Sequence, residues 1–366
     1  MSFLEDIHSL VREQQNPQPE FLANYRRLLE INGALSWRDM VQALRLLILG
    51  TPTEEERLRF LRDLTPDHAN GEMLGSAAAV LRELVPTVPT HSEPLFDCCG
   101  TGGDKLGLFN ISTLAGLTLA ACGIPIAKHG NRAITSSCGS ADLLEALSVP
   151  VNLSPEQAGK AIDEKGFAFL FAPQYHSATR NVQPLRKVLS AQGRPTLFNL
   201  LGPLSNPAYP THQLVGVFHP KHLKKMAEAL LLLDCDVAWV VSGSAGEGVW
   251  MDEISTCGPT RVAEIRGGSM REFDFHFSEV GIDPIPIQSL KGGDTSMNLE
   301  IARDVLTGKS GPYLEAVALN SGVSLYLAEK AESPREGFEL AVKTLTSGKV
   351  EALVESLGAT QTVGTA

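Results

Sequence analysis

The sequence predicts an α/β protein with two domains: a small all-helical domain and a larger domain built on a central, mainly parallel sheet flanked by helices. Three observations support this prediction. The chain has 366 residues, more than one hydrophobic core normally serves. Between about residues 20 and 85, apolar positions recur at intervals of three and four, as on one face of a helix. From about residue 90, short β-like runs alternate with glycine-bearing loops and helices.

The helical domain is expected over residues 1–88. Within it, SWRDMVQALRLLILG has the apolar period of a helix, and TPTEEERLRFLRDL begins with threonine and acidic residues, which suit a helix N-terminus. A later stretch, from His176 through NVQPLRKVLSAQG to TLFNLLGPLSNP, predicts two helices that interrupt the α/β series. We therefore expect residues of about 174–206 to complete the helical domain, with a hinge near both ends of this insertion.

The α/β domain is expected over residues 89–366. It begins with LFDCCGTGGD leading into STLAGLTLAACG, and with IPIAKHGN leading into SADLLEALSV. Two further segments, SPEQAGKAIDEKGFAFLFAP and HLKKMAEALLLLDCDVAWVVSG, each predict a helix followed by an apolar strand. The last part is expected to form two helices, SGPYLEAVALNSGVSLYLAE and SPREGFELAVKTLTSGKVEALVESL, the second with a Ser-Pro start.

Composition narrows the class of protein. Hydrophobic residues make up 43% of the chain, and no run approaches the length of a membrane span, so neither disorder nor a membrane segment is expected. The start, MSFLEDIHSLVREQQ, argues against a signal peptide and for a cytoplasmic location. Six cysteines without CxxC spacing indicate small buried residues. The net charge of −11 disfavours nucleic acid as a partner, so a phosphate substrate needs a local basic pocket.

The first motif is a glycine loop that precedes a helix. Three glycines in four positions let backbone N–H groups approach an anion, and hydroxyls at the helix N-terminus add donors. The pattern indicates a pyrophosphate cradle, with a tight strand-to-helix turn as the alternative. A dinucleotide fingerprint does not fit, because Lys105 stands where its third glycine belongs. The motif consists of Asp97, Gly100, Thr101, Gly102, Gly103 and Asp104, followed by Asn110, Ser112 and Thr113.

Two more motifs follow strands. Lys128-His129-Gly130-Asn131-Arg132 ends the strand IPIA and precedes a hydroxyl-rich loop, so it gathers cations, an amide and hydroxyls where a basic pocket is needed. A solvated charge cluster is its alternative. Asp252-Glu253 follows the strand VAWVVSG, and such an acid pair suits Mg²⁺, which takes one or two carboxylates together with water and phosphate oxygens. Taken alone, the pair is more typical of an ordinary surface.

Together the motifs resemble those of the anthranilate phosphoribosyltransferases. GTGGD with NIST, KHGNR with GSAD, FAPQYHSATRNV, Arg186, FNLLGPLSNPA and MDEIS occur in that family's order, over roughly residues 30 to 350. The resemblance implies a helical domain hinged to an α/β domain and a homodimer formed through the helical domain. It further implies transfer of a phosphoribosyl group from phosphoribosyl pyrophosphate to anthranilate, in tryptophan biosynthesis, with Mg²⁺ as cofactor.

The resemblance also assigns residues. The phosphoribosyl pyrophosphate site would comprise Gly100, Gly102, Gly103, Asp104, Asn110, Ser112, Thr113, Lys128 and Ser140. The anthranilate path would be lined by Gly100, His129, Asn131, His176, Arg186 and Pro203, with Arg186 as the carboxylate anchor. Pro203 as a simple helix breaker and His176 as an ordinary buried histidine stay open. The metal ligands would be Ser112, Asp252 and Glu253, and catalysis would rest on Lys128, Arg186, Asp252 and Glu253.

The sequence departs from the family pattern in four places. Lys105 and Leu108 stand in the glycine loop, and Cys138 replaces a usual serine. The segments 190–195 and 242–251 are longer than usual, and the second lacks the usual histidine, with Ser242 near its place. Two alternatives remain: a pyrimidine nucleoside phosphorylase, which uses inorganic phosphate and no divalent metal, and a non-catalytic nucleic-acid-binding relative. The acid pair and KHGNR favour the transferase.

Overall fold

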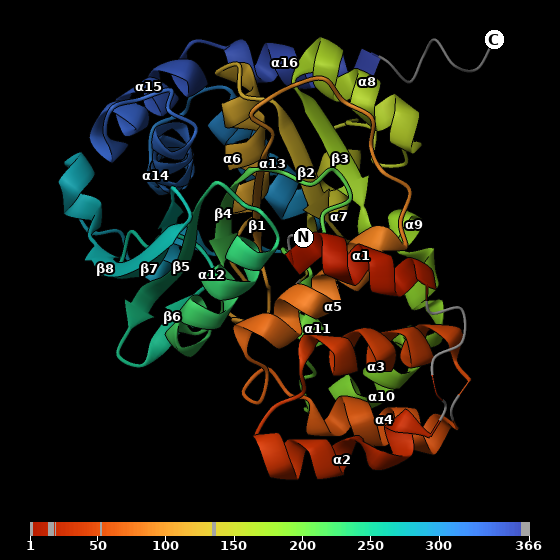
Figure 1. The fold of residues 1–366 in the computed structure, drawn as a ribbon. Coiled ribbons are helices and arrows are strands. Elements are labelled where there is room, and N and C mark those ends of the chain that lie inside the picture. Colours follow the sequence, from red (N-terminus) through yellow and green to blue (C-terminus); the bar gives the residue numbers. More distant parts are fainter. Residues whose placement is uncertain (1–2, 14–17, 19, 52, 134–136, 360–366) are drawn as a thin grey trace. The chain divides into compact units, whose positions relative to one another are not determined.

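The computed structural model describes residues 3–13, 18, 20–51, 53–133 and 137–359, and it divides into two compact units (Figure 1). The helical unit contains Met1–Pro86, Pro173–Pro207 and Lys224–Asp234. The α/β unit contains Thr87–Ala172, Ala208–Leu223 and Cys235–Ala366. Among the described residues, no helix combines the length and the apolar content that crossing a bilayer would require.

Local signals start and stop the helices of the helical unit. Ser36 and Thr53 each begin a helix with a capping box, and Gly33 and Gly50 end helices in the left-handed conformation. The first helix was not among the expected elements, and the last was expected in the α/β series. The elements are α1 Phe3–Glu13, α2 Phe21–Asn32, α3 Trp37–Leu49, α4 Glu54–Asp63, α5 Gly71–Glu83, η1 Ser177–Asn181, α10 Gln183–Ala191, α11 Phe198–Leu201 and α12 Leu223–Leu232, with α9 Ala172–Tyr175 at the boundary.

A glycine brings α5 and α12 together in this unit. A Cβ on Gly71 would lie 2.4 Å from the Cβ of Glu228. The helix α12 can therefore approach the start of α5 this closely only because Gly71 has no side chain. The buried face of α5 is rich in small residues, including Ala77 and Ala78. Close packing against α12 therefore explains why this late helix joins the unit formed by the N-terminal helices.

The α/β unit is built on one eight-stranded sheet with the order β3-β2-β1-β4-β5-β7-β8, and β6 pairs with β5. The strands from β3 to β5 are parallel, whereas β7 and β8 are antiparallel additions joined at Gly267 and Gly268, both with positive φ. The strands are β1 Phe96–Gly100, β2 Ile126–Gly130, β3 Phe167–Phe171, β4 His212–Gly216, β5 Val237–Gly246, β6 Val249–Met251, β7 Thr260–Arg266 and β8 Ser269–Phe275.

Helices cover this sheet and close its core. The central helix α6 packs against β1, β2 and β3 and also against α14, α15 and α16, while α8 and α16 lie side by side (Figure 1). The expected single helix after Ser333 is wrong: α15 and α16 are separate, because Gly348 has φ 77°. The helices are α6 Ile111–Ala121, α7 Ser140–Ala146, α8 Pro155–Lys165, α13 Thr295–Leu306, α14 Pro312–Leu327, α15 Pro334–Thr346 and α16 Lys349–Gly358, with turns η2 Pro220–His222, η3 Phe277–Val280 and η4 Ile287–Leu290.

Candidate active site

The glycine loop leaves the carboxyl end of β1 with its backbone accessible. Gly102 and Gly103 have φ of 66° and 90°, the left-handed region that favours glycine. A Cβ on Gly102 would meet nothing within 4 Å, so this peptide borders open space. Gly102 N–H donates to Asp252 Oδ2 at 2.6 Å, while Asp104 Oδ1 accepts from Leu106 N–H at 3.0 Å. The loop thus joins an accessible amide to one member of the acid pair.

The N-terminus of α6 meets the other member of that pair. Its N-cap, Asn110, makes no side-chain capping bond. Ile111 N–H donates to Phe109 O at 2.8 Å, and the amide of Ser112 is left for another acceptor. Ser112 N–H donates to Glu253 Oε1 at 3.2 Å. The positive end of the helix dipole favours a carboxylate at this position. Thr113 lies in the same turn and is buried.

Lys128 and His129 close β2 beside these groups. Lys128 is buried, and its Nζ donates to Cys98 O at 2.6 Å and to Ser112 Oγ at 3.3 Å. His129 N–H donates to Asp97 Oδ1 at 3.3 Å, which fixes the backbone as the chain leaves the strand. A buried ammonium group therefore lies next to the helix N-terminus that receives Glu253.

The acid pair sits on three glycines at the ends of neighbouring strands. A Cβ on Gly100 would lie 2.2 Å from Asp252 Oδ2, one on Gly216 would lie 1.7 Å from Asp252 O, and one on Gly243 would lie 2.5 Å from Glu253 O. Any larger residue would displace the loop. The sequence analysis missed Gly216 and Gly243, although a glycine in an otherwise apolar strand is a known sign of close backbone approach.

Burial raises the pKa of both carboxyl groups of the acid pair. Burial raises the pKa of Asp252 to about 7, with the nearby charge of Asp104 adding to the effect. Burial also raises the pKa of Glu253 to about 8, with Asp252 adding and Lys128 opposing. Two acids held this close in a low-dielectric site lack enough positive charge nearby, which is the setting in which a bound cation is stabilising.

The donor set fits Mg²⁺. Asp252, Glu253 and the hydroxyl of Ser112 supply the hard oxygen ligands that this ion prefers. Over the part of the chain that the structure describes, no cluster of three or more His, Cys, Asp or Glu forms a ready-made metal cage. A partial site of this kind suits Mg²⁺, because this ion usually binds a few protein groups together with water and substrate phosphate.

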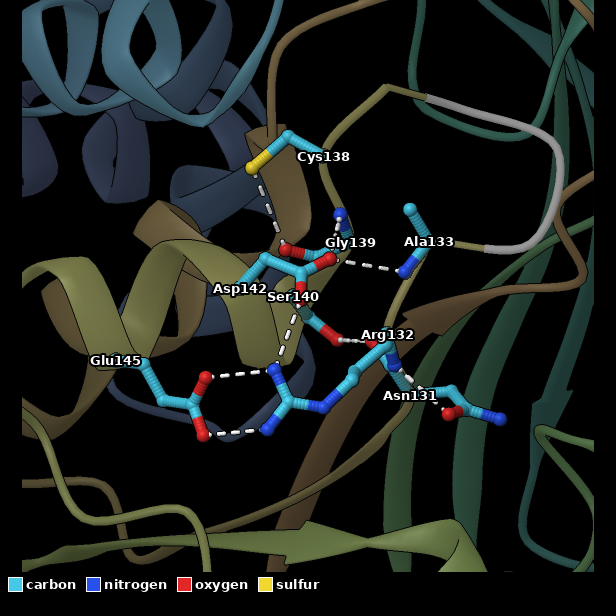
Figure 2. A network of polar contacts seen from close by, with 8 residues as sticks. All are labelled: Asn131, Arg132, Ala133, Cys138, Gly139, Ser140, Asp142 and Glu145. Carbon is cyan, nitrogen blue, oxygen red and sulfur yellow. Dashed lines mark hydrogen bonds and ion pairs between the residues drawn. The ribbon is translucent and has the colours of Figure 1, made fainter.

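The two cations of the second motif, Lys128 and Arg132, have different surroundings, and Figure 2 shows those of Arg132. The Arg132 guanidinium donates to both carboxylate oxygens of Glu145 at 2.6 Å and to Asp142 at 3.1 Å. Two carboxylates therefore neutralise Arg132, and the expectation that it adds to a basic pocket is wrong. Lys128 is the motif's buried cation.

The same network shapes the loop before α7 (Figure 2). Asp142 Oδ2 accepts from Ala133 N–H and from Gly139 N–H, both at 2.9 Å, and Ser140 Oγ donates to Asn131 O at 3.1 Å. These bonds tie the end of β2 to the start of α7. Candidate residues Asn131 and Ser140 are thereby brought together, whereas Thr135 and Ser136 of the intervening loop lie outside the described residues.

A further residue that the sequence analysis missed joins this loop to α6. Asn298 of α13 is buried and donates through Nδ2 to Asn110 Oδ1 at 3.1 Å, while it accepts from Gly293 N–H at 2.9 Å. Asn110 Nδ2 in turn donates to Cys138 O at 3.1 Å. The side-chain amide of Asn110 is therefore held in a chain of contacts that links three loops.

The structure describes the residues at which the sequence departs from the family pattern. Lys105 has φ 59° and is exposed, and Leu108 forms an isolated bridge with Lys291. Cys138 is buried, and burial raises the pKa of its thiol. Ser242 is buried within β5, and the longer segment 242–251 forms the β5–β6 hairpin. The segment 190–195 contains the end of α10 and the turn that follows it.

The remaining candidates belong to the helical unit. Arg186 of α10 is partly buried and stacks on Phe198, with its guanidinium carbon 5.2 Å from the ring centroid. Burial lowers its pKa, and among the described residues no carboxylate pairs with it. His176 is buried, and burial lowers its pKa to about 4, so it is neutral at pH 7. Pro203 follows α11 and is also buried.

Comparison with known proteins identifies relatives along most of the chain. A family model described as "Glycosyl transferase family, a/b domain" matches residues 92–351. Anthranilate phosphoribosyltransferase of Persephonella marina is 39% identical over 338 residues, which are 92% of this chain and 98% of that protein. The Thermus thermophilus enzyme of the same name has a TM-score of 0.82 at 40% identity, covering 89% of this chain and 95% of the other. The Saccharomyces cerevisiae enzyme in complex with PRPP and Mg has a TM-score of 0.81 at 25% identity, covering 93% and 98%.

Proposed function

Because this chain belongs to the anthranilate phosphoribosyltransferase family, we propose that it transfers the phosphoribosyl group of phosphoribosyl pyrophosphate to the amine of anthranilate. The products are phosphoribosyl-anthranilate and pyrophosphate, a step of tryptophan biosynthesis, and Mg²⁺ is the cofactor. A solved relative is described in complex with PRPP and Mg, which supports both ligands. The phosphorylase and nucleic-acid-binding alternatives have no comparable support among the relatives reported above.

One observation carries the proposal: both members of the acid pair bond to backbone amides of the anion-binding loops. Asp252 accepts from the glycine loop at Gly102, and Glu253 accepts from the start of α6 at Ser112. Sites for a cation and for a diphosphate are thus contiguous. Mg²⁺, when bound, supplies positive charge that offsets the charge developing on the departing pyrophosphate.

The chain's own groups serve the departure of pyrophosphate. The bond from ribose C1 to the pyrophosphate oxygen breaks as the bond from C1 to the amine nitrogen forms. Lys128 Nζ and the amide of Gly103 stabilise the leaving group, because preorganised donors in a buried site need little rearrangement as charge develops, while the amide of Gly102 holds Asp252. The amine of anthranilate is neutral at pH 7, so it attacks C1 directly, and the proton that its nitrogen then loses passes to water without a strong general base.

Arg186 is our candidate for anchoring the anthranilate carboxylate. The guanidinium is partly buried and stacks on Phe198, and no protein carboxylate pairs with it in the described part of the chain. A substrate carboxylate would therefore neutralise its charge. Gly100, His129, Asn131, His176 and Pro203 are proposed to line the path of the aromatic ring. A neutral His176 suits contact with an aromatic substrate.

The finer features of the assignment are also proposals. We assign the domain limits 1–88 and 89–366, with about 174–206 completing the helical domain, to the two domains of the family. We further propose a cytoplasmic homodimer formed through the helical unit. Ile31 and Leu49 of that unit are 67% and 51% exposed, and an interface between two helical units would cover such apolar side chains.

The test is an assay of pyrophosphate release from phosphoribosyl pyrophosphate, with and without anthranilate and Mg²⁺. We expect release that requires all three components. Thermal-shift measurements with phosphoribosyl pyrophosphate plus Mg²⁺, and then with anthranilate added, report on the two substrate sites separately. Phosphate-dependent cleavage of uridine without a divalent metal, in the absence of pyrophosphate release, would replace the proposal by the phosphorylase alternative.

A further inference from the structure

Asn320 is a buried polar residue in the middle of an apolar helix. It lies in α14, where its neighbours Leu319 and Val323 are fully buried, and Asn320 is itself fully buried. Asparagine is a poor residue for a helix interior, and burying its amide is unfavourable unless the polar atoms are bonded. Its presence at this position therefore requires a specific partner.

The partner is the residue that follows the acid pair. Asn320 Oδ1 accepts from Ile254 N–H at 3.0 Å, and Asn320 Nδ2 donates to Ile254 O at 3.3 Å. The second amide hydrogen is used within the helix, on Ala316 O at 3.0 Å. One side chain thus satisfies both backbone groups of Ile254, which requires a donor and an acceptor on the same planar group. Asparagine provides both, whereas aspartate or leucine of similar size does not.

The two hydrogen bonds from Asn320 to the backbone of Ile254, here called the clamp, lie on one side of the acid-pair loop, and the three glycines lie on the other. On the sheet side, the backbone of Asp252 and Glu253 rests against Gly216 and Gly243, with no room for a Cβ between them. On the helix side, Asn320 bonds the next peptide in the chain. The loop is therefore held from two sides, which fixes the backbone that carries the two carboxyl groups.

We propose that Asn320 is a positioning residue, which holds the backbone after Glu253 so that the acid pair is presented to the metal and the diphosphate. This inference rests on the proposed function. Loss of the side-chain amide leaves two buried backbone groups without partners and frees the loop to move. The effect is expected on metal-dependent substrate binding, because Asn320 contacts neither the glycine loop nor the helical unit through any bond described above.

The experiment compares Asn320→Ala with Ser321→Ala. Ser321 is the next residue of the same helix, is equally buried, and donates to Val317 O of its own helix at 2.7 Å, so it controls for the loss of a buried polar group in α14. Calorimetric titration measures the binding of phosphoribosyl pyrophosphate at saturating Mg²⁺ and in EDTA. Circular dichroism and urea unfolding establish that each variant is folded.

We expect Asn320→Ala to weaken Mg²⁺-dependent binding about tenfold or more and to raise the Mg²⁺ concentration for half-maximal binding. Binding in EDTA and the KM for anthranilate should change less than about twofold, and Ser321→Ala should stay within about twofold throughout. Asn320→Ser, which keeps a hydroxyl at this position, provides the second variant if the alanine variant does not fold.

Three results would overturn the inference. A folded Asn320 variant with unchanged Mg²⁺-dependent affinity would show that the clamp does not position the acid pair. An equal loss in Ser321→Ala would show that the effect belongs to the helix core. If neither Asn320 variant folds, the residue serves the core and not the site. Failure of the wild-type protein to bind phosphoribosyl pyrophosphate with Mg²⁺ would instead refute the proposed function.

Discussion

Replacement of Gly216 by alanine tests the packing that places the acid pair. A Cβ at this position would lie 1.7 Å from Asp252 O and 2.3 Å from Asp252 C, and both are backbone atoms that cannot rotate away. Because Cβ contacts below 3.0 Å are essentially never seen, β4 and the loop must separate by about 1.3 Å. A displacement of this size in a group that binds substrate or metal costs about a hundredfold in rate.

We therefore expect Gly216→Ala to lower kcat/KM for phosphoribosyl pyrophosphate about a hundredfold. Overpacking of this kind should also destabilise the fold by about 1–3 kcal/mol. Steady-state kinetics at saturating Mg²⁺ and urea unfolding measure the two effects. Gly258→Ala is the matched control, because its Cβ would meet the side chain of Ser244 at 3.3 Å, a contact that a small adjustment relieves.

The control should retain kcat/KM within about threefold of wild type. If Gly216→Ala folds and also retains kcat/KM within about threefold, the contact between β4 and the acid loop does not determine the geometry of the site.

Three further predictions follow from the site. The double variant Asp252→Asn, Glu253→Gln should lose about 2–4 kcal/mol of transition-state stabilisation in the Mg²⁺-dependent reaction, and a rate within threefold of wild type would contradict the metal assignment. Arg186→Gln should raise the KM for anthranilate while that for phosphoribosyl pyrophosphate stays nearly constant, and a proportional rise in both would argue against a carboxylate anchor. His176 has a folded-state pKa of about 4, below the ordinary 6.5, so the unfolded chain binds more protons between these values and stability falls as the pH falls through that interval. The loss attributable to His176 should total about 3 kcal/mol, so urea unfolding of His176→Gln should show a correspondingly flatter pH profile, and an unchanged profile would contradict the low pKa of this histidine.

Residues whose role is local were predictable from the sequence. The glycine run 100–103 predicted a loop with an accessible backbone, and Gly102 and Gly103 do have positive φ. The segment TPTEEERLRFLRDL predicted a helix start, and its Thr53 forms a capping box. These conformations depend on a few neighbouring residues, so sequence patterns identify them. The separate helices α15 and α16 belong to the same class, since Gly348 was a local stop signal that the sequence analysis overlooked.

Residues whose role depends on distant contacts were not predictable in the same way. Arg132 looked like a pocket cation, but Asp142 and Glu145, which neutralise it, lie ten and thirteen residues further along the chain and approach it only when α7 folds back. No sequence pattern indicated a role for Asn320, because that role depends on its hydrogen bonds to Ile254, 66 residues away. Charge balance and hydrogen-bond satisfaction are properties of the assembled structure.

The resemblance of the motifs indicated the family to which the chain is related. By itself, the amino-acid sequence also determined many of the helices and strands and the positions of the loops that can bind anions, although α1 was not foreseen and α15 and α16 were expected as one helix. Those features follow from backbone preferences and apolar periodicity, which act over a few residues. Only the tertiary structure decided which charges remain available, where the acid pair lies, and which glycines and amides hold it there. The physical reason is that close packing and desolvation act between segments far apart in the chain, through distances that no linear pattern contains.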